Sequence, residues 1–126
     1  MSSVVVADGH EVVRQGIRAL LNTDPHFRIA GEARDGVEAV RVVERTKPDI
    51  LLLDIVMPGL NGIEVIREAL KVSSSTRILV LSMHADESYV VQAFRNGASG
   101  YILKDARSQE LLEAVRLVAA GQRYLS

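Results

Sequence analysis

The chain has 126 residues, of which 48% are hydrophobic and 25% charged, so it is one domain in size and able to bury a core. Fifteen Lys plus Arg against sixteen Asp plus Glu give a net charge of −1, which argues against a strongly basic nucleic-acid surface. The chain has no cysteine, which excludes disulfides, thiolate nucleophiles and cysteine zinc sites. No apolar run approaches the roughly 20 residues of a membrane span. Met1 leads into a short strand pattern rather than a signal peptide, and we therefore expect a soluble, cytoplasmic domain.

Short apolar runs alternate with stretches of helical periodicity along the whole chain. Five short runs are candidate strands: Val4–Ala7, Phe27–Ala30, Ile50–Leu53, Ile78–Leu81 and Tyr101–Leu103. Two of them are continuously apolar and bounded by polar residues, which suits strands buried on both faces of a parallel sheet. Each of the five runs is followed by apolar residues at helical spacing, in the sets Val13, Ile17, Leu20 and Leu21; Val37, Val40 and Val43; Ile63, Ile66 and Leu70; Val90, Phe94 and Ala98; Leu111, Val115 and Val118. Helix ends are expected at Asn22, Gly97 and Gly121, and before Pro48. The pattern predicts an α/β domain with a doubly wound, five-stranded parallel sheet and five helices on its two faces.

Polar or charged side chains stand at the ends of four of the five predicted strands. Asp8 follows the first strand, Asp54 the third, Ser82 the fourth and Lys104 the fifth. Function collects beyond the C-terminal ends of the strands in such a sheet, and the expected strand order places these four strands side by side. We therefore expect the four residues to converge at one edge.

Two carboxylates, a hydroxyl and an ammonium in one pocket point to phosphoryl chemistry. Asp8 and Asp54 are able to hold a hard cation such as Mg²⁺, which usually keeps several waters and binds few carboxylates. Asp54 is then a nucleophile toward a phosphoryl group, with Lys104 offsetting charge on its oxygens and Ser82 donating to them. Taken singly, each residue has an ordinary explanation as a helix cap, a turn residue or a solvated charge. Their joint placement at four strand ends favours a site.

The segments around these residues are Val6-Ala7-Asp8-Gly9-His10, Leu53-Asp54-Ile55-Val56-Met57-Pro58-Gly59-Leu60-Asn61-Gly62, Leu81-Ser82-Met83 and Gly97-Ala98-Ser99-Gly100-Tyr101-Ile102-Leu103-Lys104-Asp105. They resemble the receiver domains of two-component response regulators over nearly the whole chain. The stretches 8–21, 97–105 and 119–126 look most like the NarL/FixJ (LuxR-type) subgroup, in which a linker and a helix-turn-helix DNA-binding domain follow the receiver. The resemblance implies a flavodoxin-like (CheY-like) fold with (βα)5 topology.

The resemblance also implies a role for each matched residue. Asp54 matches the aspartate that accepts a phosphoryl group from a histidine kinase. Asp8 matches an acidic residue of the Mg²⁺ pocket, and the backbone carbonyl of Val56 falls where the family supplies a further metal ligand. Ser82 matches the hydroxyl residue that moves toward the phosphoryl group, and Lys104 matches the lysine that pairs with it.

One residue departs from the family pattern at the metal pocket. The family has two adjacent acidic residues after the first strand, and the second, which is the more direct metal ligand, is replaced here by Gly9. Because ligand charge is a main determinant of affinity for hard cations, we expect Mg²⁺ to bind more weakly. The sequence therefore predicts a receiver whose metal-dependent phosphorylation is weakened, or one that signals without it.

Four further residues lie near the same edge of the predicted sheet. Tyr101 matches the aromatic switch position of the family, and ordinary strand packing is the alternative explanation for it. Asp105 stands where most receivers have proline after the lysine, and we expect a trans peptide bond before it because a cis bond would be costly. His10 and His84 lack a plausible set of accompanying ligands, so we expect them to be solvated or capping residues.

The expected function is a signalling switch in which phosphorylation of Asp54 biases a two-state arrangement of the fourth and fifth strand–helix units. Residues 1–126 are expected to be one receiver with its core at about 3–121, and residues 122–126 to begin a linker to an absent DNA-binding domain. The expected partners are a sensor histidine kinase and a second copy of the chain, with no membrane and no direct DNA contact. The face of the fourth and fifth helices and the face of the first and fifth are both open as dimer surfaces.

Three other functions are alternatives to the switch. A degenerate receiver, which acts through protein contact without phosphorylation, is favoured by Gly9. A phosphohydrolase would need a second acid two residues after Asp54, where Val56 stands. A flavodoxin-type cofactor binder would need a Ser/Thr/Gly-rich phosphate loop after the first strand, where residues 8–11 are poor anion ligands. We expect no enzymatic activity beyond self-phosphorylation from donors and autodephosphorylation.

Overall fold

The secondary structure follows the predicted alternation of strands and helices. The structure, a computed structural model, describes residues 1–83 and 86–125. Its strands are β1 (Ser2–Ala7), β2 (Phe27–Ala33), β3 (Ile50–Asp54), β4 (Arg77–Ser82), β5 (Gly100–Leu103) and β6 (Tyr124–Leu125). Its helices are α1 (Glu11–Leu21), α2 (Gly36–Thr46), α3 (Gly62–Val72), α4 (Glu87–Arg95) and α5 (Ser108–Ala119).

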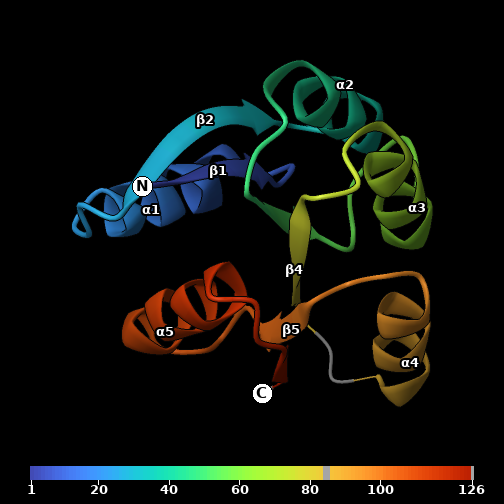
Figure 1. Cartoon of the computed structure of the whole chain (residues 1–126). Coiled ribbons are helices and arrows are strands. Elements are labelled where there is room, and N and C mark those ends of the chain that lie inside the picture. Colours follow the sequence, from blue (N-terminus) through green and yellow to red (C-terminus); the bar gives the residue numbers. More distant parts are fainter. Residues whose placement is uncertain (84–85, 126) are drawn as a thin grey trace.

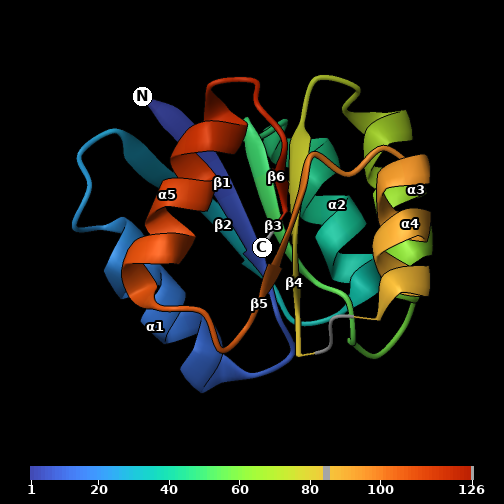
Figure 2. The ribbon, with the colours of Figure 1, turned by 90° about the horizontal axis from the view of Figure 1, so that it is seen from below.

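The strands form one parallel sheet in the order β2-β1-β3-β4-β5-β6. Figures 1 and 2 show α1 and α5 on one face of this sheet and α2, α3 and α4 on the other. The predicted doubly wound α/β fold is therefore confirmed. The sheet has six strands rather than the predicted five, because Tyr124 and Leu125 pair with Gly100 and Tyr101 along the edge of β5.

Apolar cores lie on both faces of the sheet because successive residues of a strand point to opposite sides. In β3, Leu52 packs into the core beneath α1 and α5, whereas Leu51 and Leu53 pack beneath α2 and α3. All three leucines are fully buried. Burial on both faces explains why β3 is an uninterrupted apolar run.

The ends of the helices follow from their capping residues. Asp35, Asn61 and Asp86 each accept a backbone hydrogen bond at the start of α2, α3 and α4, which satisfies donors that have no partner within the helix. Gly97 and Gly121 follow α4 and α5 with φ of +110° and +91°, a left-handed conformation that glycine adopts without strain. Both glycines were predicted to end helices.

In α2 and α4 the buried residues differ from the apolar residues that were predicted to face the core. Val37 is 42% exposed, and α2 instead buries Ala39, Val42 and Val43. Val42 packs directly on the backbone of Gly31 in β2, where a Cβ would lie 2.7 Å from Val42 Cγ1. This contact explains why the face of α2 that contains Val42 is the buried one. Ala98 lies beyond the end of α4 and is buried after the turn, rather than on the helix.

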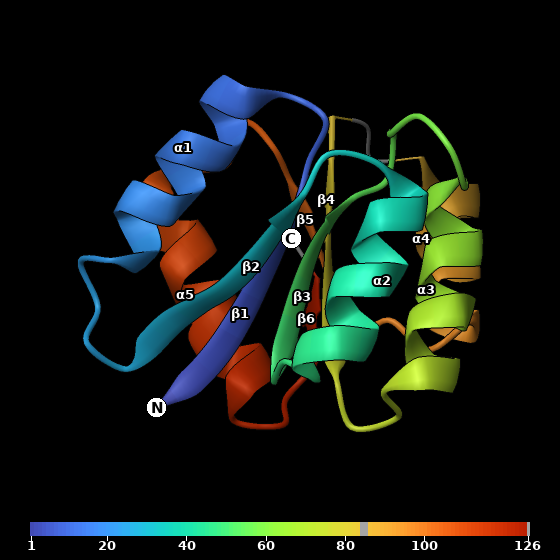
Figure 3. The ribbon, with the colours of Figure 1, turned by 90° about the horizontal axis from the view of Figure 1, so that it is seen from above.

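The carboxyl ends of β1, β3, β4 and β5 lie together at one end of the sheet. Figure 3 shows this end opposite the N-terminus, with the loop from β1 to α1 beside the loops that leave β3 and β5. The register explains the alignment, since Ala7 pairs with Leu53 and Ser82 pairs with Leu103. Asp8 follows Ala7, Asp54 follows Leu53 and Lys104 follows Leu103. The three residues therefore lie at the same height along the strands, at the carboxyl edge of the sheet.

Candidate functional site

An ion-paired cluster lies at the carboxyl edge of the sheet. Lys104 Nζ lies 2.8 Å from Asp8 Oδ2 and 3.0 Å from Asp54 Oδ2. Asp8 is fully buried and Asp54 is 3% exposed. The structure therefore brings together three of the four strand-end residues around one ammonium group.

Lys104 keeps its positive charge in this setting. Burial by itself would lower the pKa of Lys104, but the hydrogen bonds and negative charges of Asp8 and Asp54 outweigh it, and the pKa lies above its usual value. Two carboxylates around one ammonium leave the cluster with a formal charge of −1. An additional cation is therefore favoured electrostatically at this edge.

Backbone contacts fix the two carboxylates. Asp54 Oδ1 accepts a hydrogen bond of 3.1 Å from the Val56 N–H, and Asp8 Oδ1 accepts one of 2.8 Å from the His10 N–H. Arg14, on α1, donates from its guanidinium to the carbonyl oxygen of Asp8 at 2.6 Å and is itself buried. Arg14 is a site residue that the sequence did not predict, although its place three positions before Ile17 on the inner face of α1 is a signal for it.

Ser82 and Tyr101 lie on the neighbouring strands β4 and β5. Ser82 is 2% exposed at the end of β4, and its carbonyl oxygen accepts a 2.7 Å hydrogen bond from the Lys104 N–H. Tyr101, on β5, is 2% exposed and packs in the core beneath α2, α3 and α4. The backbone of Ser82 thus lies beside that of Lys104 across the sheet. Tyr101 packs as a core residue in this structure.

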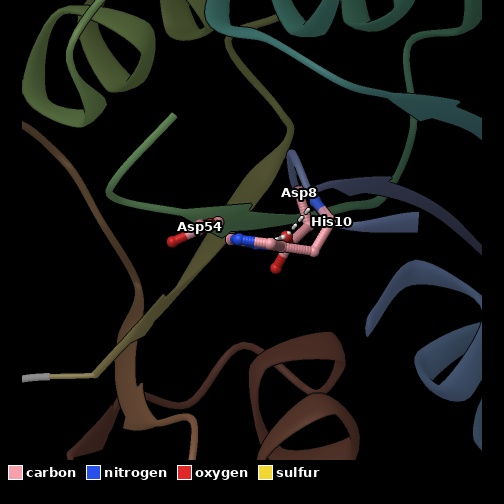
Figure 4. A group of neighbouring side chains, drawn as sticks. All are labelled: Asp8, His10 and Asp54. Carbon is pink, nitrogen blue, oxygen red and sulfur yellow. Dashed lines mark hydrogen bonds and ion pairs between the residues drawn. The ribbon is translucent and has the colours of Figure 1, made fainter. Parts of the chain in front are cut away.

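Asp8, His10 and Asp54 place candidate metal ligands close together. One ligand atom from each residue lies within 4.8 Å of the others, and Figure 4 shows the imidazole of His10 between the two carboxylates. His10 was expected to be solvated or to cap a helix. It stands at the N-cap position of α1 without a side-chain cap bond, and its ring contacts Asp8 instead. His84 lies outside the described residues.

The residues present fit a divalent cation of the kind that keeps several waters. Such an ion usually takes one or two carboxylates from the protein, and Asp8 and Asp54 supply two. Gly9 supplies no donor from its side chain, and a Cβ there would meet only Arg34 and Pro58 backbone or ring atoms, at 3.5 and 3.6 Å. The space beside Gly9 is therefore open to a side chain.

The pattern of the chain matches a known family over most of its length. Residues 4–116 match the family model of the response regulator receiver domain. The chain belongs to this receiver family. Members are signalling domains rather than classical enzymes. No peptide bond among the described residues of this receiver is cis, so the bond before Asp105 is trans, as predicted.

Relatives with curated descriptions are transcriptional regulators of the NarL type. The receiver is 41% identical over 122 residues to the transcriptional regulatory protein DegU of Brevibacillus brevis, which covers 97% of this chain and 52% of that protein. It is 38% identical over 125 residues to the nitrate/nitrite response regulator protein NarL of Escherichia coli (strain K12), covering 99% of this chain and 58% of that protein. The chain thus spans little more than half the length of these relatives.

Solved structures agree with this grouping. A two-component response regulator of the LuxR family from Aurantimonas sp. SI85-9A1 is 36% identical with a TM-score of 0.95, covering 100% of this chain and 90% of that chain. The signal receiver domain of a NarL response regulator from Mycobacterium tuberculosis is 36% identical with a TM-score of 0.90, covering 96% of this chain and 98% of that chain.

Within residues 1–83 and 86–125 of this receiver, no helix is both long and apolar enough to cross a membrane.

Proposed function

We propose that this receiver accepts a phosphoryl group on Asp54 from a sensor histidine kinase, in a reaction that depends on Mg²⁺. The observation that carries the proposal is the contact of Lys104 Nζ with Asp54 Oδ2 at 3.0 Å, within a motif that matches the receiver family. A carboxylate oxygen of Asp54 forms the new bond to phosphorus while the bond from phosphorus to the kinase's histidine nitrogen breaks. The same attack on a small phosphodonor would give self-phosphorylation.

The residues of the pocket prepare Asp54 for this attack. The Val56 N–H, which donates to Asp54 Oδ1, holds the carboxylate in one orientation. Lys104 would offset charge on the phosphoryl oxygens, and the Ser82 hydroxyl would donate to them. Asp8, Asp54 and the backbone carbonyl of Val56 would hold Mg²⁺, which supplies charge neutralisation for the phosphoryl oxygens when bound.

The output of the switch would be transcriptional. Phosphate on Asp54 adds charge and acceptor oxygens, so Ser82 and Lys104 engage it in only one of two arrangements, and Tyr101 changes its packing with them. Residues 1–126 would form the receiver, with a core at about 3–121. Residues 122–126, of which Tyr124 and Leu125 pair along β5 as β6, would begin the linker to a DNA-binding domain. Support comes from the curated relatives, which are transcriptional regulators about twice as long as the matched region.

A second candidate function is supported by Gly9 and by Lys104. Lys104 already contacts both carboxylates, and residue 9 contributes no negative charge. A receiver of this kind would bind its partner without phosphorylation, as an interaction module with a weakened metal site. Dimerisation through the helical faces would then be independent of the phosphoryl donor.

Intact mass after incubation with acetyl phosphate, with and without Mg²⁺, separates the two functions. The parent chain, Gly9→Asp and Asp54→Asn are compared. A single phosphate adduct on the parent that requires Mg²⁺ and is lost in Asp54→Asn supports the phosphorylated switch. No adduct on the parent together with an adduct on Gly9→Asp overturns it and supports the interaction module.

A further inference from the structure

We propose that this receiver binds a divalent transition-metal ion, such as Zn²⁺ or Mn²⁺, in preference to Mg²⁺, with the imidazole of His10 and the carboxylate of Asp54 as ligands. Asp8 holds the imidazole in place and supplies a second negative charge. The inference rests on the proposed function for its location, since it names the cation and a ligand of the same pocket. It concerns binding alone, so it is tested without any phosphoryl donor.

The position of His10 is the first observation. The candidate ligand atoms of Asp8, His10 and Asp54 all lie within 4.8 Å of one another. Ligands on opposite sides of an ion with bonds of ~2.1 Å lie about 4.2 Å apart, so small side-chain rotations suffice to bring His10 and Asp54 onto one ion. Figure 4 shows a ring nitrogen of His10 directed toward Asp54.

The hydrogen bond between His10 and Asp8 leaves the outer ring nitrogen available. His10 Nδ1 lies 3.1 Å from Asp8 Oδ1. An ionised carboxylate only accepts hydrogen bonds, so Nδ1 carries the proton and the lone pair of the neutral ring is on Nε2. Metal-ligating histidines characteristically donate their other ring N–H to a carboxylate in this way. The His10 side chain is 71% exposed, which makes Nε2 accessible to an ion from solvent.

The composition of the pocket then favours a transition metal over magnesium. Mg²⁺ prefers oxygen ligands, and Gly9 removes a position from which a third carboxylate would come. An imidazole nitrogen adds affinity for Zn²⁺ and other first-row ions, whereas it adds little for Mg²⁺. The His10 nitrogen thus takes the place of an oxygen ligand. This change of ligand favours transition-metal ions over Mg²⁺.

A second turn has the same Asp–His pair, but among the described residues this pair belongs to no group of three candidate metal ligands. In the loop after α1, Asp24 Oδ1 accepts from the His26 N–H at 2.9 Å and lies 2.9 Å from His26 Nδ1. There the third neighbour is a cation, since Arg116 Nε donates to Asp24 Oδ2 at 2.9 Å. At His10 the paired aspartate also meets a cation, since Lys104 Nζ lies 2.8 Å from Asp8 Oδ2, but the carboxylate of Asp54 adds a second negative charge and a further candidate ligand beside the ring. His26 is therefore a matched internal control.

Isothermal titration calorimetry of the metal-free chain with ZnCl₂, MnCl₂ and MgCl₂ tests the inference. Parent, His10→Asn and His26→Asn are compared. We expect one Zn²⁺ per chain, bound at least about tenfold more tightly than Mg²⁺, with His10→Asn losing on the order of tenfold or more of the Zn²⁺ affinity. His26→Asn is expected to bind Zn²⁺ like the parent. With Mn²⁺, pulsed electron paramagnetic resonance should detect a coupled imidazole nitrogen that disappears in His10→Asn.

Several results would overturn the inference. They are equal Zn²⁺ affinity in the parent and His10→Asn, equal affinity of the parent for Zn²⁺ and Mg²⁺, and loss of the bound ion in His26→Asn. Circular dichroism on heating confirms that each variant is folded. If Asp54 is phosphorylated but metal binding does not depend on His10, this inference is rejected and the proposed function stands. His10-dependent Zn²⁺ binding without any adduct supports the inference and rejects the phosphorylated switch.

Discussion

Arg116 on α5 and Asp24 in the loop after α1 form an ion pair, with Arg116 Nε 2.9 Å from Asp24 Oδ2. Asp24 is 5% exposed, and its other oxygen accepts from the backbone and lies beside the ring of His26. The backbone hydrogen bond from His26, followed by the contacts with Arg116 and the His26 ring, lowers the pKa of Asp24 to about 2. This buried carboxylate joins the two helices on one face of the sheet.

Acid is therefore expected to weaken the folded state through Asp24. The carboxyl has a pKa of 3.8 in a model peptide and about 2 in the folded chain, so the folded state binds its proton less readily than the unfolded chain does. The stabilisation is fully present above pH 3.8, and it is lost as the pH falls toward 2. Urea unfolding of the parent and Asp24→Asn at several pH values should show a stability difference that shrinks over this window.

The contribution of Arg116 to the lowered pKa of Asp24 is tested with the variant Arg116→Gln. A ¹³C NMR titration should show the pKa of Asp24 raised toward its ordinary value in this variant, because the guanidinium hydrogen bond and charge are gone. Glu68→Gln is the control, since Glu68 pairs with Lys71 on the exposed surface of α3, where ion pairs contribute little. An unchanged pKa of Asp24 in Arg116→Gln would show that the His26 contacts alone set it.

Ionisation of Tyr124 is expected to lower the free energy of unfolding at high pH. Burial, with the 2.5 Å hydrogen bond that its hydroxyl donates to Glu110, raises the pKa of Tyr124 from 10.0 to about 12. The folded state holds this proton more tightly than the unfolded chain, so its contribution is complete below pH 10 and disappears as the pH rises through 12. Absorbance titration at 295 nm should show a late tyrosine ionisation in the parent that Tyr124→Phe removes. Retention of that late ionisation in Tyr124→Phe would assign it to Tyr89 or Tyr101.

The order of strands and helices could be predicted because the central strands are buried on both faces. Residues 50–53 read as a continuous apolar run for that reason, and the turns at Gly97 and Gly121 mark helix ends by their conformation. β6 could not be predicted in the same way. It has two residues, and it is held by the Tyr124 N–H donating to Ser99 and the Tyr124 hydroxyl donating to Glu110, contacts that leave no local periodicity.

The meeting of Asp8, Asp54 and Lys104 was also predictable, since each stands at the end of a parallel strand. The contacts of Arg14 and His10 with Asp8 were not, because a charged residue on a helix and a histidine in a turn are usually solvated. The Arg14 contact depends on how α1 packs beside the end of β1, whereas the His10 contact forms within a local turn. The roles of Ser82, Tyr101 and the Val56 carbonyl concern the phosphorylated or metal-bound protein, and they stay predictions.

Two glycines give opposite predictions for the same substitution. A Cβ added at Gly62, the first residue of α3, would lie 2.5 Å from Ile55 Cγ1 and 2.9 Å from the Ile55 backbone, so Gly62→Ala forces the loop after Asp54 to shift. We expect a loss of about 1–3 kcal/mol in the free energy of unfolding. Gly16 lies on the exposed side of α1 with no atom near the added Cβ, and Gly16→Ala should stabilise by about 0.5–1 kcal/mol. Urea unfolding measures both, and equal effects would contradict the packing argument.

Lys104 is expected to stabilise the metal-free fold by separating two buried negative charges. Removing one partner of a buried ion pair leaves its charge uncompensated, so Lys104→Met should lower the free energy of unfolding by about 3 kcal/mol at neutral pH in EDTA. Adding Asp8→Asn removes one of the two carboxylates that face the lost ammonium, and the double variant should recover at least about 1 kcal/mol of that loss. The contacts of 2.8 and 3.0 Å from Lys104 Nζ to the carboxylates are the basis of this coupling. Urea unfolding of the parent, both single variants and the double variant measures it, and purely additive losses would mean that Lys104 and Asp8 act independently.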